Sequence, residues 1–176
     1  MALRPFRKEG LHFISDALDI AEDKTGDYYK FSFDQWKRHR YDVKTHSSLK
    51  RGEVSGRAFA LLNKCSRAMS GFDPKTKSRD FYFICLQDHQ ILKALERDKN
   101  LTLGPLLVYI LTHELVHIVR FSNFYERFET EGKARENEER IVHHTTFDIL
   151  KDLSLPNMAY VLEAYRNHRI CDLMIS

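Results

Sequence analysis

The residues best suited by type and spacing to do chemistry together are His113, Glu114 and His117, which lie in the apolar stretch LLVYILTHELVHIVRF. On a helix, His113 and His117 project from one face, one turn apart. Two neutral imidazoles in this arrangement chelate Zn²⁺, and a glutamate beside the first of them can take a proton from a water that the ion activates. The pattern predicts one Zn²⁺ per chain, held by His113 and His117, with Glu114 as the general base.

The helix that must carry this motif is predicted over residues 106–120. Asn100 or Thr102 serves as its N-cap, and Pro105 stands in its first turn, where a missing N–H costs nothing. The alternative is that both histidines are hydrogen-bonded core residues and that Glu114 lies on the surface. We favour a metal, because two imidazoles and a carboxylate on one apolar helix are costly to bury without partners.

A catalytic zinc needs a third protein ligand, and the identity of that ligand sorts the subclass. A metzincin would have Gly and His where this chain has Arg120 and Asn123, so that subclass is excluded. The remaining candidates are the glutamates of the acidic stretch that follows: Glu131, Glu136, Glu138 and Glu139.

Helical periodicity ranks these glutamates. A helix is predicted over residues 133–153, with an apolar face made of Ile141, Val142, Thr145, Thr146, Ile149, Leu150 and Leu153. Glu138 falls within this face, Glu139 towards its edge and Glu136 on the opposite side. Because a carboxylate on an apolar face needs a cation, we predict Glu138 as the third zinc ligand. The alternative is that Glu138 pairs with an arginine such as Arg135 or Arg120.

Two motifs together resemble the gluzincin branch of zinc metallopeptidases, of which thermolysin is the familiar member. They are His113-Glu114-Leu115-Val116-His117 and, further on, Asn137-Glu138; the thermolysin-like second motif also begins Asn-Glu. The small size is similar to minimal single-domain gluzincins and to the immunity metallopeptidases that cleave phage repressors. The resemblance implies a zincin-like fold, with His113, His117 and Glu138 as zinc ligands and Glu114 as general base and acid.

The resemblance also implies that the strand before the active-site helix forms the upper rim of the cleft and pairs with an extended substrate. Asp80–Leu86 (DFYFICL) is the candidate strand. In thermolysin-like chains, an aspartate that supports a ligand histidine follows the second-motif glutamate by four residues; here that position is Val142. His143 and His144 fall off the apolar face of their helix, so we expect both at the surface.

Gluzincins often supply a tyrosine or histidine that stabilises the oxyanion, and the last helix offers Tyr160, Tyr165 and His168. We single out Tyr160, against the alternative that these are ordinary half-buried side chains.

Length and composition predict one domain over residues 1–176, since the chain has 43% apolar and 30% charged residues. Its 7 Gly and 4 Pro exclude collagen-like and low-complexity chains. Cys65, Cys85 and Cys171 share no short spacing, which excludes a zinc ribbon and a disulfide framework. No signal-peptide core is visible, and the longest apolar run, residues 106–111, is too short to span a bilayer. We therefore expect a cytoplasmic protein with no membrane partner.

The formal charge of +3, from 28 basic and 25 acidic residues, gives no overall footprint for nucleic acid. Residues 37–51 are locally basic and are flanked by Trp36 and Tyr41, which would suit stacking on bases. We interpret this segment as a solvated loop or exposed hairpin. A DNA-associated protease is the alternative.

The predicted fold class is α+β, with strands in the N-terminal half and helices in the C-terminal half. Helices are expected over residues 11–21, 57–68, 90–97, 106–120, 133–153 and 158–168, and strands over 28–36 and Asp80–Leu86. The predicted activity is hydrolysis of a peptide or protein substrate by a zinc-activated water. A non-catalytic zinc-binding module of zincin-like fold is the rival function.

Overall fold

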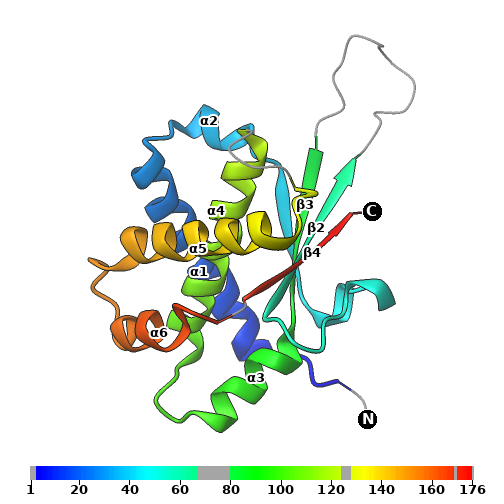
Figure 1. Cartoon of the computed structure of the whole chain (residues 1–176). Helices are drawn as coiled ribbons and strands as arrows, with labels where there is room; N and C mark the ends of the chain where they lie inside the picture. The colour runs from blue at the N-terminus through cyan, green and yellow to red at the C-terminus, as the bar shows by residue number, and fades with distance from the viewer. Residues whose placement is uncertain (1–2, 67–79, 124–127, 169, 176) are drawn as a thin grey trace.

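The computed structural model describes residues 3–66, 80–123, 128–168 and 170–175. Within them the chain is a mixed α+β fold in which helices α1, α4, α5 and α6 gather on one side of a four-stranded sheet (Figure 1). The helices are α1 (Lys8–Tyr29), α2 (Phe33–Lys37), α3 (Asp88–Arg97), α4 (Leu103–Ser122), α5 (Gly132–Leu150) and α6 (Met158–Tyr165), with short 3-10 turns at His46–Ser48 and Arg51–Glu53. The strands are β1 (Tyr41–Lys44), β2 (Ala60–Ser66), β3 (Asp80–Leu86) and β4 (Cys171–Ile175).

The sheet has the strand order β1-β3-β2-β4. β3 pairs parallel with β1 and antiparallel with β2, so that Ile84 lies between Val43 and Leu62, while β4 pairs parallel with β2 at the far edge. The expectation of a buried strand at Asp80–Leu86 is confirmed. Its expected role as the rim strand is wrong, because β3 already has a strand on each side and has no free edge for a substrate along Tyr82–Cys85.

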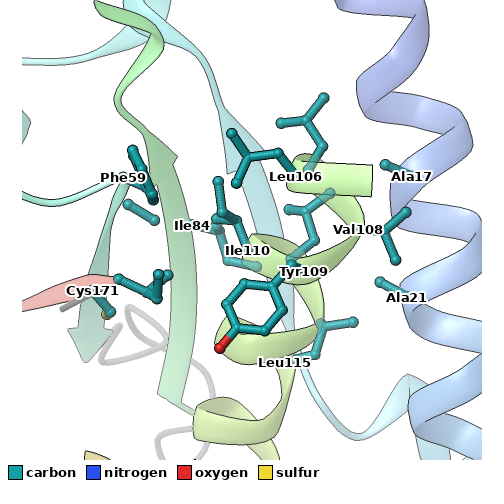
Figure 2. Close-up of a cluster of buried hydrophobic side chains, with 14 of the residues drawn as sticks. Ala17, Ala21, Phe59, Ile84, Leu106, Val108, Tyr109, Ile110, Leu115 and Cys171 are labelled. Carbon is teal, nitrogen blue, oxygen red and sulfur yellow. The ribbon is translucent and has the colours of Figure 1, made fainter. Parts of the chain in front are cut away.

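Helix α4 is the central helix of the fold. Its N-cap is Thr102, which is one of the two N-caps expected from the sequence. The helix packs on α1, α5, α6 and the strands β2 and β3. Figure 2 shows Val108 of α4 facing Ala17 and Ala21 of α1, with Leu106 and Ile110 turned towards the sheet. Small alanines on α1 let the two helices approach closely, which buries almost the whole surface of α4.

Within the described part of the chain, α4 is the one helix long and apolar enough to cross a membrane. However, 83% of its most apolar window is buried inside the fold. A helix that is apolar all round is expected at the centre of a packed core, so its composition is accounted for by that position.

The predicted strand over residues 28–36 is wrong. Helix α1 continues to Tyr29 and ends at Lys30, and Ser32 and Gln35 then form a capping box that starts α2. Phe31 packs its ring on those of Tyr29, Trp36 and His39 instead of lining a sheet face. Capping and local aromatic packing therefore override the alternating pattern.

The predicted helix over residues 57–68 is also wrong, since Ala60–Ser66 forms β2 between β3 and β4. The segment 37–51 is not a hairpin, because β1 lies in the sheet and Lys44 forms a buried ion pair with Glu53 at 2.9 Å. The division into an N-terminal strand half and a C-terminal helix half fails as well. The chain begins with the long helix α1, and β4 completes the sheet from the C-terminal end.

Candidate metal centre

The histidines of the motif lie in the middle of α4 and are completely buried. His113, Glu114 and His117 each have an exposed fraction of 0%. Both imidazole Nε2 atoms approach the same carboxylate, as the expected spacing on one helix face requires.

That carboxylate belongs to Glu139 of α5. Its Oε2 lies 3.3 Å from Nε2 of His113, and its Oε1 lies 3.1 Å from Nε2 of His117. Arg135, one turn earlier on α5, holds the same carboxylate through Nη2 at 2.8 Å. Glu139 therefore occupies the position that the sequence analysis assigned to the third ligand.

Glu138, the predicted third ligand, lies elsewhere. Its carboxylate forms a bidentate pair with Arg120 in the last turn of α4, with Nε–Oε1 at 2.6 Å and Nη2–Oε2 at 2.8 Å. Glu138 is indeed on the buried face of α5, with 1% of its surface exposed, but the cation that it meets there is a guanidinium. The expected place of Glu138 beside the two histidines is wrong, since Glu139 lies there, and the alternative of a pair with Arg120 is what the structure has.

His143, one turn after Glu139, faces the same centre. Its ring centroid lies 4.7 Å from that of His113, and its Nδ1 is 2.8 Å from the hydroxyl of Tyr109. One ligand atom each from His113, Glu139 and His143 lie within 4.8 Å of one another. The expectation that His143 is a surface residue is wrong. His143 follows Glu139 by four residues, which is the spacing at which thermolysin-like chains place the aspartate that supports a ligand histidine. His144 is exposed, as expected.

Both ring nitrogens of His113 and of His117 are buried without a hydrogen-bond partner in the described part of the chain, and the Glu139 oxygens beside them have ion-pair contacts instead. Four buried imidazole nitrogens without such a partner are rare in folded proteins and call for an ion or another group. Two imidazoles and a carboxylate are also a donor set that suits zinc. The residues present therefore fit the predicted metal.

The pKa shifts of His113 and Glu139 indicate protonation states that are compatible with metal binding. Burial, together with His117, holds the pKa of His113 well below its ordinary value, so the ring is neutral. Burial would raise the pKa of Glu139, but its contact with His117 and the charge of Arg135 outweigh burial and hold that pKa well below its usual range. A neutral His113 ring and an ionised Glu139 carboxylate are in the forms that bind metal.

Glu114 lies on the same helix without contacting Glu139, and its surroundings tune its basicity. Burial raises the pKa of Glu114 to about 7, which suits a group that must accept and release a proton near neutral pH. Cys171, the first residue of β4, is also fully buried, and burial together with the Glu114 carboxylate raises the pKa of its thiol well above the ordinary value. Glu114 therefore faces a neutral thiol. No local sequence pattern indicates this neighbour, because β4 is not among the strands that the sequence predicts.

The expected oxyanion donor, Tyr160, is not brought to the centre. It lies 38% exposed on α6, and its hydroxyl bonds to Asp98. Tyr165 packs its ring on Phe59 and contributes to the centre only indirectly, through a carbonyl 3.4 Å from the Tyr109 hydroxyl. The expectation for Tyr160 is not supported by its position, and the polar groups nearest the centre are His143 and Tyr109.

A pocket of about 440 Å³ opens beside the centre. Glu139 and His143 line it from α5, and the chain after α6 closes it with Arg166 and His168. Because Glu139 retains 20% exposure of its side chain, this pocket connects the buried histidines to the surroundings.

Comparison of the sequence with models of protein families and with curated proteins, and of the structure with solved structures, finds no match. The functional argument for this chain therefore depends on the geometry of its own residues.

Proposed function

We propose that this protein is a zinc-dependent metallopeptidase with a single zincin-like domain. The observation that carries the proposal is the convergence of the His113 and His117 Nε2 atoms on the two oxygens of Glu139, at 3.3 and 3.1 Å. The buried ring nitrogens of His113 and His117, which have no hydrogen-bond partner among the described residues, support an ion at this point. A peptide or protein substrate and a cytoplasmic location remain predictions from the sequence.

In this proposal His113, His117 and Glu139 hold one Zn²⁺ per chain. The ion supplies Lewis acidity, which polarises a carbonyl and lowers the pKa of a water. Arg135 fixes the Glu139 carboxylate by its 2.8 Å contact, in the way that neighbouring groups orient the ligands of metal sites.

Glu114 serves as the proton carrier. Its carboxylate would accept a proton from the water as the water oxygen bonds to the carbonyl carbon of the substrate. The same proton would then pass to the amine nitrogen as the C–N bond breaks. Burial raises the pKa of the Glu114 carboxyl, which favours its taking up a proton. The neutral Cys171 thiol beside it leaves the negative charge of Glu114 available for this role.

A non-catalytic zinc-binding module is the second candidate function, and the position of His143 favours it. Structural zinc sites are closed by four protein ligands, whereas catalytic sites keep one position open. If the Tyr109 hydroxyl accepts from Nδ1–H of His143, the other ring nitrogen carries no proton and could become a fourth ligand in place of the interaction of this ring with the His168 backbone. If Tyr109 donates to Nδ1, that other nitrogen carries the proton and does not bind metal.

The test is hydrolysis by the zinc-loaded protein. Wild-type protein, Glu114→Gln and Glu138→Gln are incubated with a peptide library, and new termini are identified by mass spectrometry. We expect wild type and Glu138→Gln to cleave and Glu114→Gln to be inactive with zinc still bound. Zinc-loaded wild type that cleaves nothing would contradict the proposal, and a fourth histidine ligand in X-ray absorption would then support the non-catalytic module.

A further inference from the structure

The pocket beside the centre is lined by cationic side chains. Arg135 and Arg140 project from α5, and Arg166 follows α6. We propose that this pocket binds a carboxylate of the substrate, so that the peptides hydrolysed carry an acidic group close to the cleaved bond. This inference rests on the proposed metallopeptidase function and specifies its substrate class.

The location of the pocket ties recognition to the reaction. Glu139 and His143 are lining residues, so a group held in the pocket lies beside the proposed zinc ligands. A volume of about 440 Å³ is in the range of small-ligand sites and accommodates a side chain or a chain end. A peptide anchored there would place a neighbouring backbone carbonyl near Glu139.

The charges of the pocket leave positive charge available. Glu139 already interacts with the two histidines and Arg135, so Glu136 is the one other carboxylate among the lining residues. Arg140 has no ion pair with any residue in the described ranges, and Arg166 has a loose contact of 3.7 Å with Glu163, in which both side chains are largely exposed. Exposed pairs of this kind contribute little and yield readily to a better partner.

Arg135 supplies a further, independent indication. While its Nη2 contacts Glu139, its Nη1 is buried without a hydrogen-bond partner among the described residues. An unpaired guanidinium nitrogen is costly to bury, and a second carboxylate would satisfy it. Arginine binds carboxylates in a bidentate manner, which gives both affinity and orientation.

The carboxylate can come from an acidic side chain or from the C-terminus of a peptide. Four peptide libraries separate these sources. Each has Glu or Gln at one fixed position, no other acidic residue, and a free or amidated C-terminus, and each carries an uncharged coumarin label. Fluorescence anisotropy measures their binding to zinc-loaded Glu114→Gln protein, in which turnover is suppressed, and cleavage by wild type is measured in parallel.

We expect about tenfold tighter binding of the libraries that carry the recognised carboxylate, the ratio that one charge-assisted contact supplies. A preference for Glu over Gln identifies a side chain, and a preference for the free over the amidated end identifies the C-terminus. Introducing Arg140→Gln and Arg166→Gln together should reduce either preference to less than about twofold, a loss of most of that contact. Arg51→Gln, an exposed arginine outside the pocket, removes one positive charge as the control and should leave the preference unchanged.

Equal binding of all four libraries overturns the inference, as does a preference that survives the double substitution. Binding of Arg140→Lys with Arg166→Lys should keep part of the preference, which separates loss of charge from loss of folding. The two proposals can fail separately. Acid-selective binding without cleavage by wild type contradicts the peptidase function, whereas cleavage without acid selectivity contradicts the pocket assignment alone.

Discussion

Arg120 and Glu138 form a bidentate ion pair that joins the last turn of α4 to the first turns of α5, with contacts of 2.6 and 2.8 Å. The pair fixes the rotation of α5 about its own axis. Since successive residues on a helix are about 100° apart, fixing Glu138 on Arg120 directs Glu139 towards His113 and His117. The pair is thus a structural support for the centre, with no direct part in it.

Replacing Glu138 by Gln should therefore affect stability more than metal binding. The substitution removes two charge-assisted contacts from a side chain that is 1% exposed, so we expect the free energy of unfolding to fall by about 1.5–3 kcal/mol. Urea denaturation followed by circular dichroism measures this difference. Unchanged stability would mean that the pair does not position α5.

Glu114→Gln keeps the shape of the side chain and removes the base. We expect the zinc content to be unchanged and kcat to fall by about 10²–10⁴-fold, the contribution of general-base catalysis. Loss of zinc in this variant would make Glu114 a ligand and contradict the assigned role.

His117 and His143 both face Glu139, and their replacement should separate ligand from neighbour. His117→Ala should abolish zinc binding, since it removes a nitrogen 3.1 Å from the Glu139 carboxylate. His143→Gln should keep zinc and lower kcat by about 10- to 100-fold, the usual effect of groups that support a metal site. Zinc content and kcat are measured on both variants. Loss of zinc from His143→Gln would favour the closed, non-catalytic site.

Glu53 gives a prediction of pH dependence away from the centre. Although burial acts to raise the pKa of this carboxyl, bonds from Lys50 N–H, Lys44 and Asn63 outweigh it and lower that pKa below its ordinary value of 4.5. The stabilisation is therefore complete above pH 4.5 and is lost as pH falls through the folded-state pKa. Glu53→Gln should cost about 1–3 kcal/mol at pH 7.

The same Glu53→Gln difference in unfolding free energy should shrink as the pH is lowered below 4.5, because protonation removes the charge from the wild-type side chain as well. Denaturant titrations of both proteins across this pH range provide the measurement. A difference that stays constant with pH would show that the ionised form of Glu53 is not what stabilises the fold.

The helices of the centre could be predicted because their local signals agree with their tertiary setting. Thr102 and Pro105 mark the start of α4, and a continuous apolar run follows. The burial order of the glutamates was also correct, with Glu138 buried, Glu139 at the edge and Glu136 exposed. The inference that the most buried glutamate, Glu138, faces the histidines was wrong. The two histidines meet α5 at the edge of the contact between α4 and α5, where Glu139 also lines the pocket.

The sheet could be predicted only in part. β3 has a strong apolar β pattern. The apolar residues of β2 have a spacing that is typical of a helix, and this segment becomes a strand because β3 and β4 flank it. β4 follows α6 directly, with too weak a local pattern to be recognised, and Cys171 was therefore not placed near Glu114. Non-local pairing decides such segments, and no local spacing records it.

The central claim is that Glu139, and not its neighbour Glu138, completes the zinc site with His113 and His117. The most direct test is the metal content, by mass spectrometry of the elements, of wild type, Glu139→Ala and Glu138→Ala purified without chelators. We expect one Zn²⁺ per chain in wild type and in folded Glu138→Ala, and none in folded Glu139→Ala. Zinc retained by Glu139→Ala, or absent from the wild-type protein, would contradict the account.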